Sequence, residues 1–230
     1  MAEWICRVSD NYSQSVLSQS EMETNALNIM AILNKQMGWS LEAVAGALGN
    51  MQRESTLNPG ACEGGRGVPA QNALYYGGGL GLIQWTDYPA YQREHVHPIL
   101  WSARHFNQNW WDGTFQCTLL GYANDATITS CGEGVGALWG WLESDSYPSI
   151  SFPDYKYFTG SVDDATEYWY FCMEMHSTYE DAMELRKQYA NYWYSFLQGE
   201  DPPIPTPSPT PSIYKKMPLW MKTLRPYYRR

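Results

Sequence analysis

Glu54 has the side chain and the surroundings that acid–base chemistry would need. It lies in the segment Asn50-Met-Gln-Arg-Glu-Ser-Thr-Leu-Asn-Pro-Gly60, directly after the run GWSLEAVAGALG of small and apolar residues. The negative pole of a helix C-terminus and burial beside apolar side chains would both favour a protonated carboxyl. A glutamic acid that keeps its proton near neutral pH can protonate the leaving oxygen of a glycoside. The same local pattern also fits an ordinary glutamate at a frayed helix end.

The helix that would carry Glu54 is predicted over residues 41–55. Apolar residues recur at helical spacing, Ser40 is a suitable N-cap, and Glu42 in the first turn is favoured by the helix dipole. The helix is slim, so other helices can pack closely around it. Its small residues are Ala45, Gly46, Ala47 and Gly49.

Other elements frame this helix. We predict a preceding helix from the capping box Ser20-Glu-Met-Glu23 to near Met37-Gly38, and a loop or hairpin over the glycine-rich residues 60–81. Two closing helices are predicted after the caps Ser161-Val-Asp-Asp164 and Ser177-Thr-Tyr-Glu180. The second is expected to end at Gly199, and its apolar face is predicted as Ala182, Leu185, Tyr189, Tyr192, Trp193 and Phe196.

A second motif, GLGLIQWT at residues 79–86, follows the glycine-rich stretch. Together with GWSLEAVAGALGNMQRESTLNPG it resembles the phage tail lysozyme family, the peptidoglycan-cutting domains of bacteriophage tails. The two motifs are also similar to those of lytic transglycosylases and goose-type lysozymes. The resemblance extends over roughly residues 22–197 and implies a mainly α (α+β) fold. That fold would have two lobes with a groove between them and a small glycine-rich β-hairpin or loop region.

By this resemblance, Glu54 matches the catalytic acid, and Ser55 matches the residue that supports the acid or touches the substrate. Gly81 and Gln84 match the substrate-groove motif. A glycine lets a sugar ring approach the backbone, and an amide both donates to and accepts from sugar hydroxyl or acetamido groups.

The aromatic and acidic neighbours of this motif are further candidates. Trp85 and Tyr76 could lie against a sugar face or pack in the core, and Thr86 belongs to the same predicted substrate-binding segment. Asp87 is the preferred second catalytic carboxylate, and Glu63 is another candidate, although either could be a solvated loop acid. If neither reaches the groove, a one-glutamate lytic transglycosylase route becomes the better interpretation.

Composition and charge limit the classes of function that fit this protein. The net charge of −9 argues against nucleic-acid binding, whereas 11 Trp and 18 Tyr suit a core or a sugar-binding surface. His95 and His97 lack a helical zinc spacing, so we expect neither a metal site nor a cofactor. The five cysteines show no spacing typical of metal ligands, and the sequence alone does not decide whether Cys117 and Cys131 form a disulfide bridge. We expect no transmembrane segment and no signal peptide.

The charge and proline content also predict the domain organisation. We expect an N-terminal segment over 1–21, a lysozyme-like catalytic domain over 22–199, a proline-rich linker over 200–212 and a basic aromatic tail over 213–230. Residues 1–200 contain 9 Lys/Arg and 23 Asp/Glu, whereas residues 201–230 contain 6 and 1. The tail is a docking peptide for the phage particle, a surface-binding tail or a disordered, solubilising end.

The predicted function is cleavage of the β-1,4 bond between N-acetylmuramic acid and N-acetylglucosamine in bacterial peptidoglycan. The enzyme would sit in the virion among other phage tail or tail-knob proteins and open the host wall for genome entry. The alternatives are a non-catalytic tail-tip or glycan-binding component and an endolysin released at host lysis.

Overall fold

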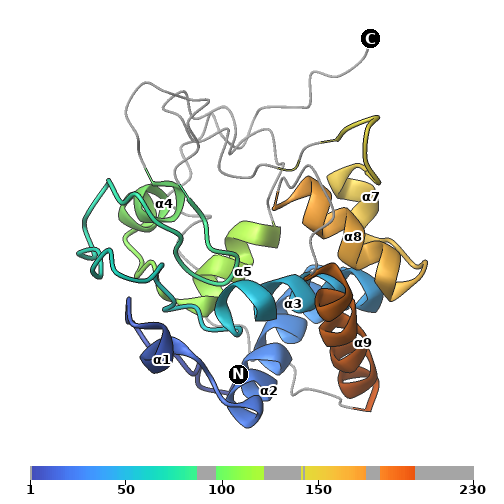
Figure 1. The fold of residues 1–230 in the computed structure, drawn as a ribbon, viewed down its shortest axis with the longest axis horizontal. Helices are drawn as coiled ribbons and strands as arrows, with labels where there is room; N and C mark the ends of the chain where they lie inside the picture. The colour runs from blue at the N-terminus through green and yellow to red at the C-terminus, as the bar shows by residue number, and fades with distance from the viewer. Residues whose placement is uncertain (1, 87–96, 122–140, 142, 175–181, 200–230) are drawn as a thin grey trace.

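The protein was analysed as a computed structural model that describes residues 2–86, 97–121, 141, 143–174 and 182–199. These residues are mainly helical, as the sequence predicted (Figure 1). In these ranges the extended segments pair only through isolated bridges, so the glycine-rich region is a loop rather than a hairpin. The elements are α1 (Tyr12–Ser15), α2 (Gln19–Met30), the π-helix η1 (Ala31–Gln36), α3 (Leu41–Ser55), α4 (Pro98–Phe106), α5 (Gly113–Gly121), α7 (Phe152–Lys156), α8 (Val162–Cys172) and α9 (Met183–Gly199).

Helix α3 lies at the centre and packs mainly on α8 and α9. A Cβ added at Gly46 would come within 2.7 Å of the Ala165 carbonyl carbon of α8. A Cβ added at Gly49 would come within 2.5 Å of the Arg186 carbonyl oxygen of α9. The two glycines therefore let three helix backbones approach one another, which confirms the prediction of a slim inner helix.

Two of the predicted helix caps are confirmed. The Ser40 hydroxyl accepts a hydrogen bond from the Ala43 backbone N–H at the start of α3 (3.1 Å). The Ser161 hydroxyl does the same for Asp164 at the start of α8 (3.0 Å). Both serines satisfy N–H groups that a helix cannot satisfy internally.

The predicted cap of α2 is wrong by two residues. The capping box uses Ser18, whose backbone N–H donates to Glu21 Oε2 (2.8 Å), rather than Ser20 and Glu23. Both serine–glutamate pairs have the same spacing, so the sequence pattern alone could not separate them. At its other end the helix continues as η1 and stops where Gly38 adopts a left-handed conformation (φ 76°), close to the predicted end.

The C-terminus of α3 lies where the sequence predicted it. Thr56 and Leu57 are both left-handed, with φ of 53° and 57°, and they end the helix at Ser55. Two consecutive non-glycine residues in this conformation are strained, so the surrounding contacts must hold them.

Asn58, the residue after this pair, binds the N-terminal segment. Its side chain is fully buried. Oδ1 accepts from the backbone N–H groups of Arg7 and Gly60 (3.0 Å each), and Nδ2 donates to the carbonyls of Arg7 and Ser15 (2.9 Å each). Asn25 of α2 likewise accepts a hydrogen bond from the Ile5 backbone N–H and donates one to the Ile5 carbonyl. Residues 5–15 are therefore part of the folded body, although they precede the expected start of the catalytic domain.

We expect Asn58→Ala to lower the free energy of unfolding by about 2–4 kcal/mol, because it leaves several buried backbone groups without partners. Urea denaturation would measure this loss. Asn191→Ala is the matched control, because Asn191 is exposed and its substitution should change stability by less than about 0.5 kcal/mol. Equal effects of the two substitutions would contradict the role given to Asn58.

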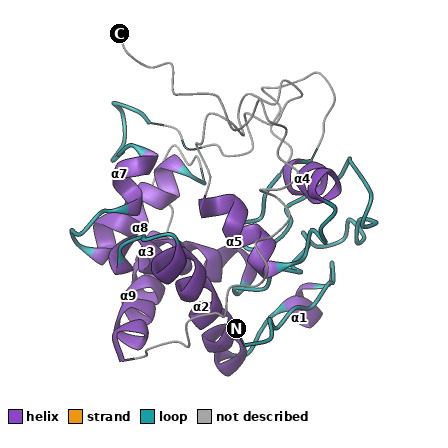
Figure 2. Ribbon diagram, turned by 180° about the vertical axis from the view of Figure 1, so that it is seen from behind, coloured by secondary structure: helices purple, strands orange, loops and turns teal. Residues whose placement is uncertain are grey.

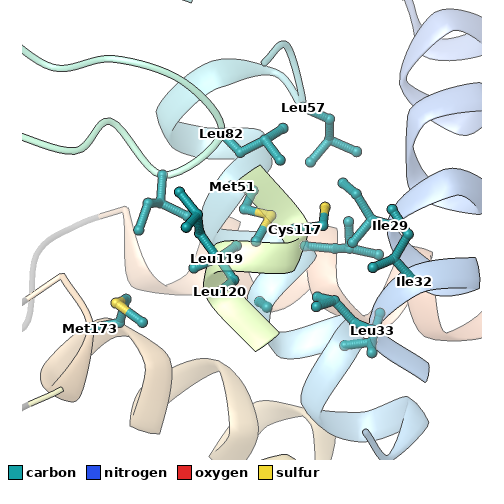
Figure 3. Close-up of a cluster of buried hydrophobic side chains, with 14 of the residues drawn as sticks. Ile29, Ile32, Leu33, Met51, Leu57, Leu82, Cys117, Leu119, Leu120 and Met173 are labelled. Atoms are coloured by element: carbon teal, nitrogen blue, oxygen red, sulfur yellow. The ribbon is translucent and has the colours of Figure 1, made fainter. Parts of the chain in front are cut away.

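The apolar core joins α2, α3 and α5 with the segment that carries the second motif (Figure 3). Leu82, Met51 and Leu57 are each fully buried. Figure 3 shows Leu82 on the same side of the cluster as Met51 and Leu57. Burial of Leu82 therefore fixes the 81–86 segment against the last turns of α3.

Two groups of elements lie on opposite sides of α3 and α5. Figures 1 and 2 both show α4, α1 and the glycine-rich loop on one side, and α7, α8 and α9 on the other. The predicted arrangement in two parts agrees with this view. Among the residues described, none of the helices is both long and apolar enough to span a bilayer.

Candidate active site

Glu54 lies in the last turn of α3, where three helices meet. Its side chain is 24% exposed, and Oε1 is 2.6 Å from Arg186 Nη2 of α9. A guanidinium at this distance stabilises negative charge on the carboxylate. The sequence had predicted apolar surroundings for this carboxyl, and the structure gives it a cationic partner instead.

Arg186 is 3% exposed, so its charge is held inside the protein by specific partners. Besides Glu54, its Nη1 donates to Asn50 Oδ1 (3.1 Å), and its guanidinium carbon lies 5.1 Å from the centre of the Tyr170 ring. A buried cation is tolerated only when it is paired and hydrogen-bonded. These contacts hold the guanidinium in one position, and through it they hold Glu54.

Asn50 is oriented by hydrogen bonds on its other side. Its Nδ2 donates to the carbonyls of Gly46 (2.9 Å) and Thr166 (3.1 Å), and the side chain is fully buried. Because both amide protons are used, Oδ1 is left to accept from Arg186. The polar cluster of Glu54, Arg186 and Asn50 therefore connects α3, α8 and α9 through hydrogen bonds.

Glu174, just beyond α8, is a second carboxyl whose pKa is affected by these charged residues. Its Oε1 accepts from Trp169 Nε1 (3.0 Å). Loss of hydration raises the pKa of Glu174 to about 8; the negative charge of Glu54 acts in the same direction, and Arg186 opposes it.

Sequence analysis missed Arg186 because it assigned the wrong face of α9. The predicted apolar face included Leu185 and Tyr192, which are 38% and 42% exposed. The face that is buried consists of Met183, Arg186, Ala190, Trp193 and Leu197. A single cation at helical spacing among apolar residues was the available signal for a functional arginine. Glu174 carried no comparable signal.

Ser55 connects the end of α3 to the second motif. Its buried hydroxyl lies 3.0 Å from the Met51 carbonyl and 2.8 Å from the Leu82 carbonyl. These contacts join Ser55, the residue after Glu54, to the 81–86 segment. They use the hydroxyl internally, so Ser55 supports the arrangement, and a direct substrate contact stays a prediction.

Gly81 and Gln84 shape a tight turn. Gly81 has φ of 77°, and a Cβ there would lie 2.6 Å from Gln116 Oε1. Gln116 accepts from the Leu82 N–H (2.8 Å) and donates to the carbonyls of Pro59 and Trp110. The glycine is therefore needed for this buried glutamine. Gln84 is itself left-handed (φ 51°) and only partly buried, with Nε2 3.0 Å from the Gly81 carbonyl.

The structure places the three remaining predicted substrate-binding residues, Tyr76, Trp85 and Thr86, in different surroundings. Trp85 is 5% exposed and belongs to the core, which is one of the two alternatives left open above. The Tyr76 hydroxyl donates to the Gly67 carbonyl (2.9 Å), and its ring packs edge-on against His97. Thr86 is exposed. Sugar binding by these three residues stays a prediction.

His97 has a structural role. It is fully buried, and its Nε2 is 2.7 Å from the Trp85 carbonyl and 3.1 Å from the Gly78 carbonyl. Because carbonyl oxygens only accept hydrogen bonds, Nε2 must carry a proton and act as the donor. Its hydrogen bonds connect Gly78 of the glycine-rich loop with Trp85 of the second motif. His95 lies outside the described residues. Within the described ranges, no group of three or more His, Cys, Asp or Glu residues could hold a metal ion.

The remaining candidates are placed as follows. Asp87, the preferred second carboxylate, lies outside the described residues. Glu63 accepts from the Gly79 N–H (3.0 Å) and pairs with Arg66 (3.0 Å), so both of its oxygens are used within the loop. Cys117 is a buried free thiol, and its possible partner Cys131 lies outside the described residues.

Comparison with known proteins agrees with these motifs. Morphogenesis protein 1 of Bacillus phage B103 is 35% identical over 113 residues, which is 43% of this chain and 29% of that protein. The chain thus spans less than a third of that relative. The family model described as phage tail lysozyme matches residues 24–197, a stretch that contains α3, the second motif and most of α9. This match covers most of the chain, and the chain therefore belongs to the phage tail lysozyme family.

Proposed function

We propose that the protein cleaves the β-1,4 bond between N-acetylmuramic acid and N-acetylglucosamine in bacterial peptidoglycan, with Glu54 as the proton donor. The observation that carries the proposal is the position of Glu54. Its carboxyl is fixed by a buried guanidinium, and Ser55 beside it is hydrogen-bonded to Leu82 of the predicted substrate segment. Family membership supports a lysozyme-like enzyme that acts on peptidoglycan.

The proposed reaction begins with transfer of a proton from Glu54 to the bridging oxygen. The bond between C1 and that oxygen breaks, and positive charge develops on the sugar that keeps C1. Either water or a hydroxyl of the same sugar then forms a new bond to C1, and its proton returns to the Glu54 carboxylate. Water gives a reducing end, and the internal hydroxyl gives an anhydro end.

Substrate binding is assigned to the turn beside Glu54. The Gln84 side chain, which is only partly buried, is the best placed of the predicted residues to exchange hydrogen bonds with a glycan. Ser55, Gly81 and His97 would act indirectly by holding this turn. Asp87 is retained as a candidate second carboxylate for the hydrolytic route.

The protein is further proposed to act from the phage tail on the host wall. Support comes from the description of the family and from the phage origin of the similar morphogenesis protein. Docking to other tail proteins is proposed for residues 213–230, whose basic character contrasts with the acidic body. Mass spectrometry of purified virions would separate a tail component from an endolysin.

Digestion of purified bacterial cell walls tests the proposed reaction. We expect soluble muropeptides whose glycan strands end in N-acetylmuramic acid, either reducing or anhydro, as resolved by mass spectrometry. Release of strands that end in reducing N-acetylglucosamine would mean that another bond is cut. Binding to the wall without any soluble product would favour a non-catalytic glycan-binding component.

A further inference from the structure

We propose that Arg186 and Asn50 are positioning residues that hold Glu54 by its Oε1 atom alone and leave Oε2 as the oxygen that gives its proton to the substrate. The inference rests on the function proposed above and deepens it, because it assigns different tasks to the two carboxyl oxygens of Glu54. Arg186 is 3% exposed and Asn50 is fully buried, so both act through Glu54 and not by touching the glycan.

The guanidinium of Arg186 presents a single nitrogen to Glu54. Its Nη2 lies 2.6 Å from Glu54 Oε1. Its Nη1 donates instead to Asn50 Oδ1 at 3.1 Å, and its Nε is buried without an acceptor among the described residues. Arginine and carboxylate groups frequently pair through a fork of two parallel hydrogen bonds. Here the second bond of such a fork is not made.

Asn50 turns Nη1 away from Glu54. Both amide protons of Asn50 are donated to the carbonyls of Gly46 and Thr166, so its Oδ1 is the atom left for Arg186. Rotation of the guanidinium into a fork with Glu54 would leave this buried oxygen unpaired, which is costly. The arrangement is therefore set by α3 and α8 before any substrate binds.

Glu54 Oε2 is the carboxyl oxygen that remains for the substrate. No hydrogen bond or ion pair joins Oε2 to another of the residues described, and the Glu54 side chain is 24% exposed. A neutral carboxyl group carries its proton on one oxygen and accepts hydrogen bonds with the other. Because Oε1 accepts from Arg186, the proton belongs on Oε2.

Proton transfer converts the hydrogen bond between Arg186 and Glu54 into an ion pair. The O–H bond at Oε2 breaks, the proton joins the bridging oxygen of the glycoside, and the electron pair stays on the carboxylate. The new negative charge meets a guanidinium that is already 2.6 Å from Oε1. A contact that is stronger after the transfer than before it lowers the barrier. A two-bond fork would instead occupy the oxygen that must hold the proton.

Rates of wall digestion by two variants test the single-oxygen contact. Arg186→Met removes every donor and should lower kcat by about 10- to 100-fold, as expected for a misplaced catalytic group. KM should change by less than about twofold, because a buried residue contributes no binding of the glycan. Arg186→Lys keeps one charged donor and should recover most of kcat, whereas a two-bond fork would be lost in both variants. Equal losses of kcat in the two variants would overturn the proposal.

A double variant tests whether Arg186 acts through Glu54. In the Glu54→Gln background, Arg186→Met should change the residual rate by less than about threefold, because the proton donor that it positions is already absent. Persistence of the full loss in that background would overturn the proposal. Arg104→Met is the matched control, because Arg104 is an exposed residue in the last turn of α4 and its loss should leave kcat unchanged.

Nitrogen-15 NMR of the arginine side chains measures the contact without substrate and without activity. A guanidinium held on two sides should give separate Nη1 and Nη2 signals, which Arg186→Lys assigns by their loss. Glu54→Gln should shift the Nη2 signal and leave Nη1 in place, since Nη1 contacts Asn50. Similar shifts of both signals would reveal a fork and overturn the proposal. The expected NMR pattern in a protein that releases no muropeptides would support the single-oxygen contact and overturn the proposed function.

Discussion

Glu54→Gln is expected to lower the rate of cell-wall digestion by about 100- to 10,000-fold while leaving the fold intact, the range that loss of a general acid usually produces. Glutamine keeps the size of the side chain, and its Oε1 can still accept from Arg186, so α3 and α9 should stay together. What is lost is the proton donor. The measurement is the initial rate of muropeptide release at the pH optimum, with circular dichroism as the check on folding.

Glu184→Gln is the matched control for this experiment. Glu184 lies in the first turn of α9 with its side chain 80% exposed, so the same chemical change should leave activity near the wild-type value. Full activity of Glu54→Gln would remove Glu54 from the reaction and would direct attention to Asp87 and Glu63. Equal loss in both variants would show a general effect of reduced charge.

Gly49→Ala is expected to lower the free energy of unfolding by about 1–3 kcal/mol and to reduce activity as well. The added methyl group would meet the Arg186 carbonyl oxygen at 2.5 Å and the Ala190 Cβ at 2.7 Å. Backbone atoms cannot move aside as a flexible side chain can, so α9 must shift away from α3. That shift carries Arg186 with it and loosens its contact with Glu54. Chemical denaturation and the digestion rate measure the two effects.

Gly199→Ala separates this steric effect from helix propensity. Gly199 lies in the last turn of α9, and a Cβ there would meet no atom of the described residues within 4 Å. Alanine favours helix over glycine, so this control should be neutral or slightly stabilising. If Gly49→Ala is equally harmless, α3 and α9 are not in the close contact that positions the cluster.

The helix that carries Glu54 was predictable because its signals are local. Ser40 as N-cap and the run of small residues act within one or two turns, so residues 41–55 were assigned with the observed bounds. The cap of α2 was misplaced because Ser18 and Ser20 offer the same motif, and only packing chooses between them. The face of α9 was misassigned because six aromatic and apolar residues fit more than one stripe.

By itself, the sequence determined the mainly α class, the slim helix 41–55, the position of Glu54 at its end and the link to the GLGLIQWT motif. The first three follow from short-range rules of capping, spacing and residue size, whereas the link to the GLGLIQWT motif is what the family resemblance implied. Only the tertiary structure decided that the Glu54 carboxyl pairs with Arg186, which is 132 residues away in the chain. Electrostatic partners depend on distances through space, and a sequence pattern carries no record of which distant charge folding will bring within 3 Å.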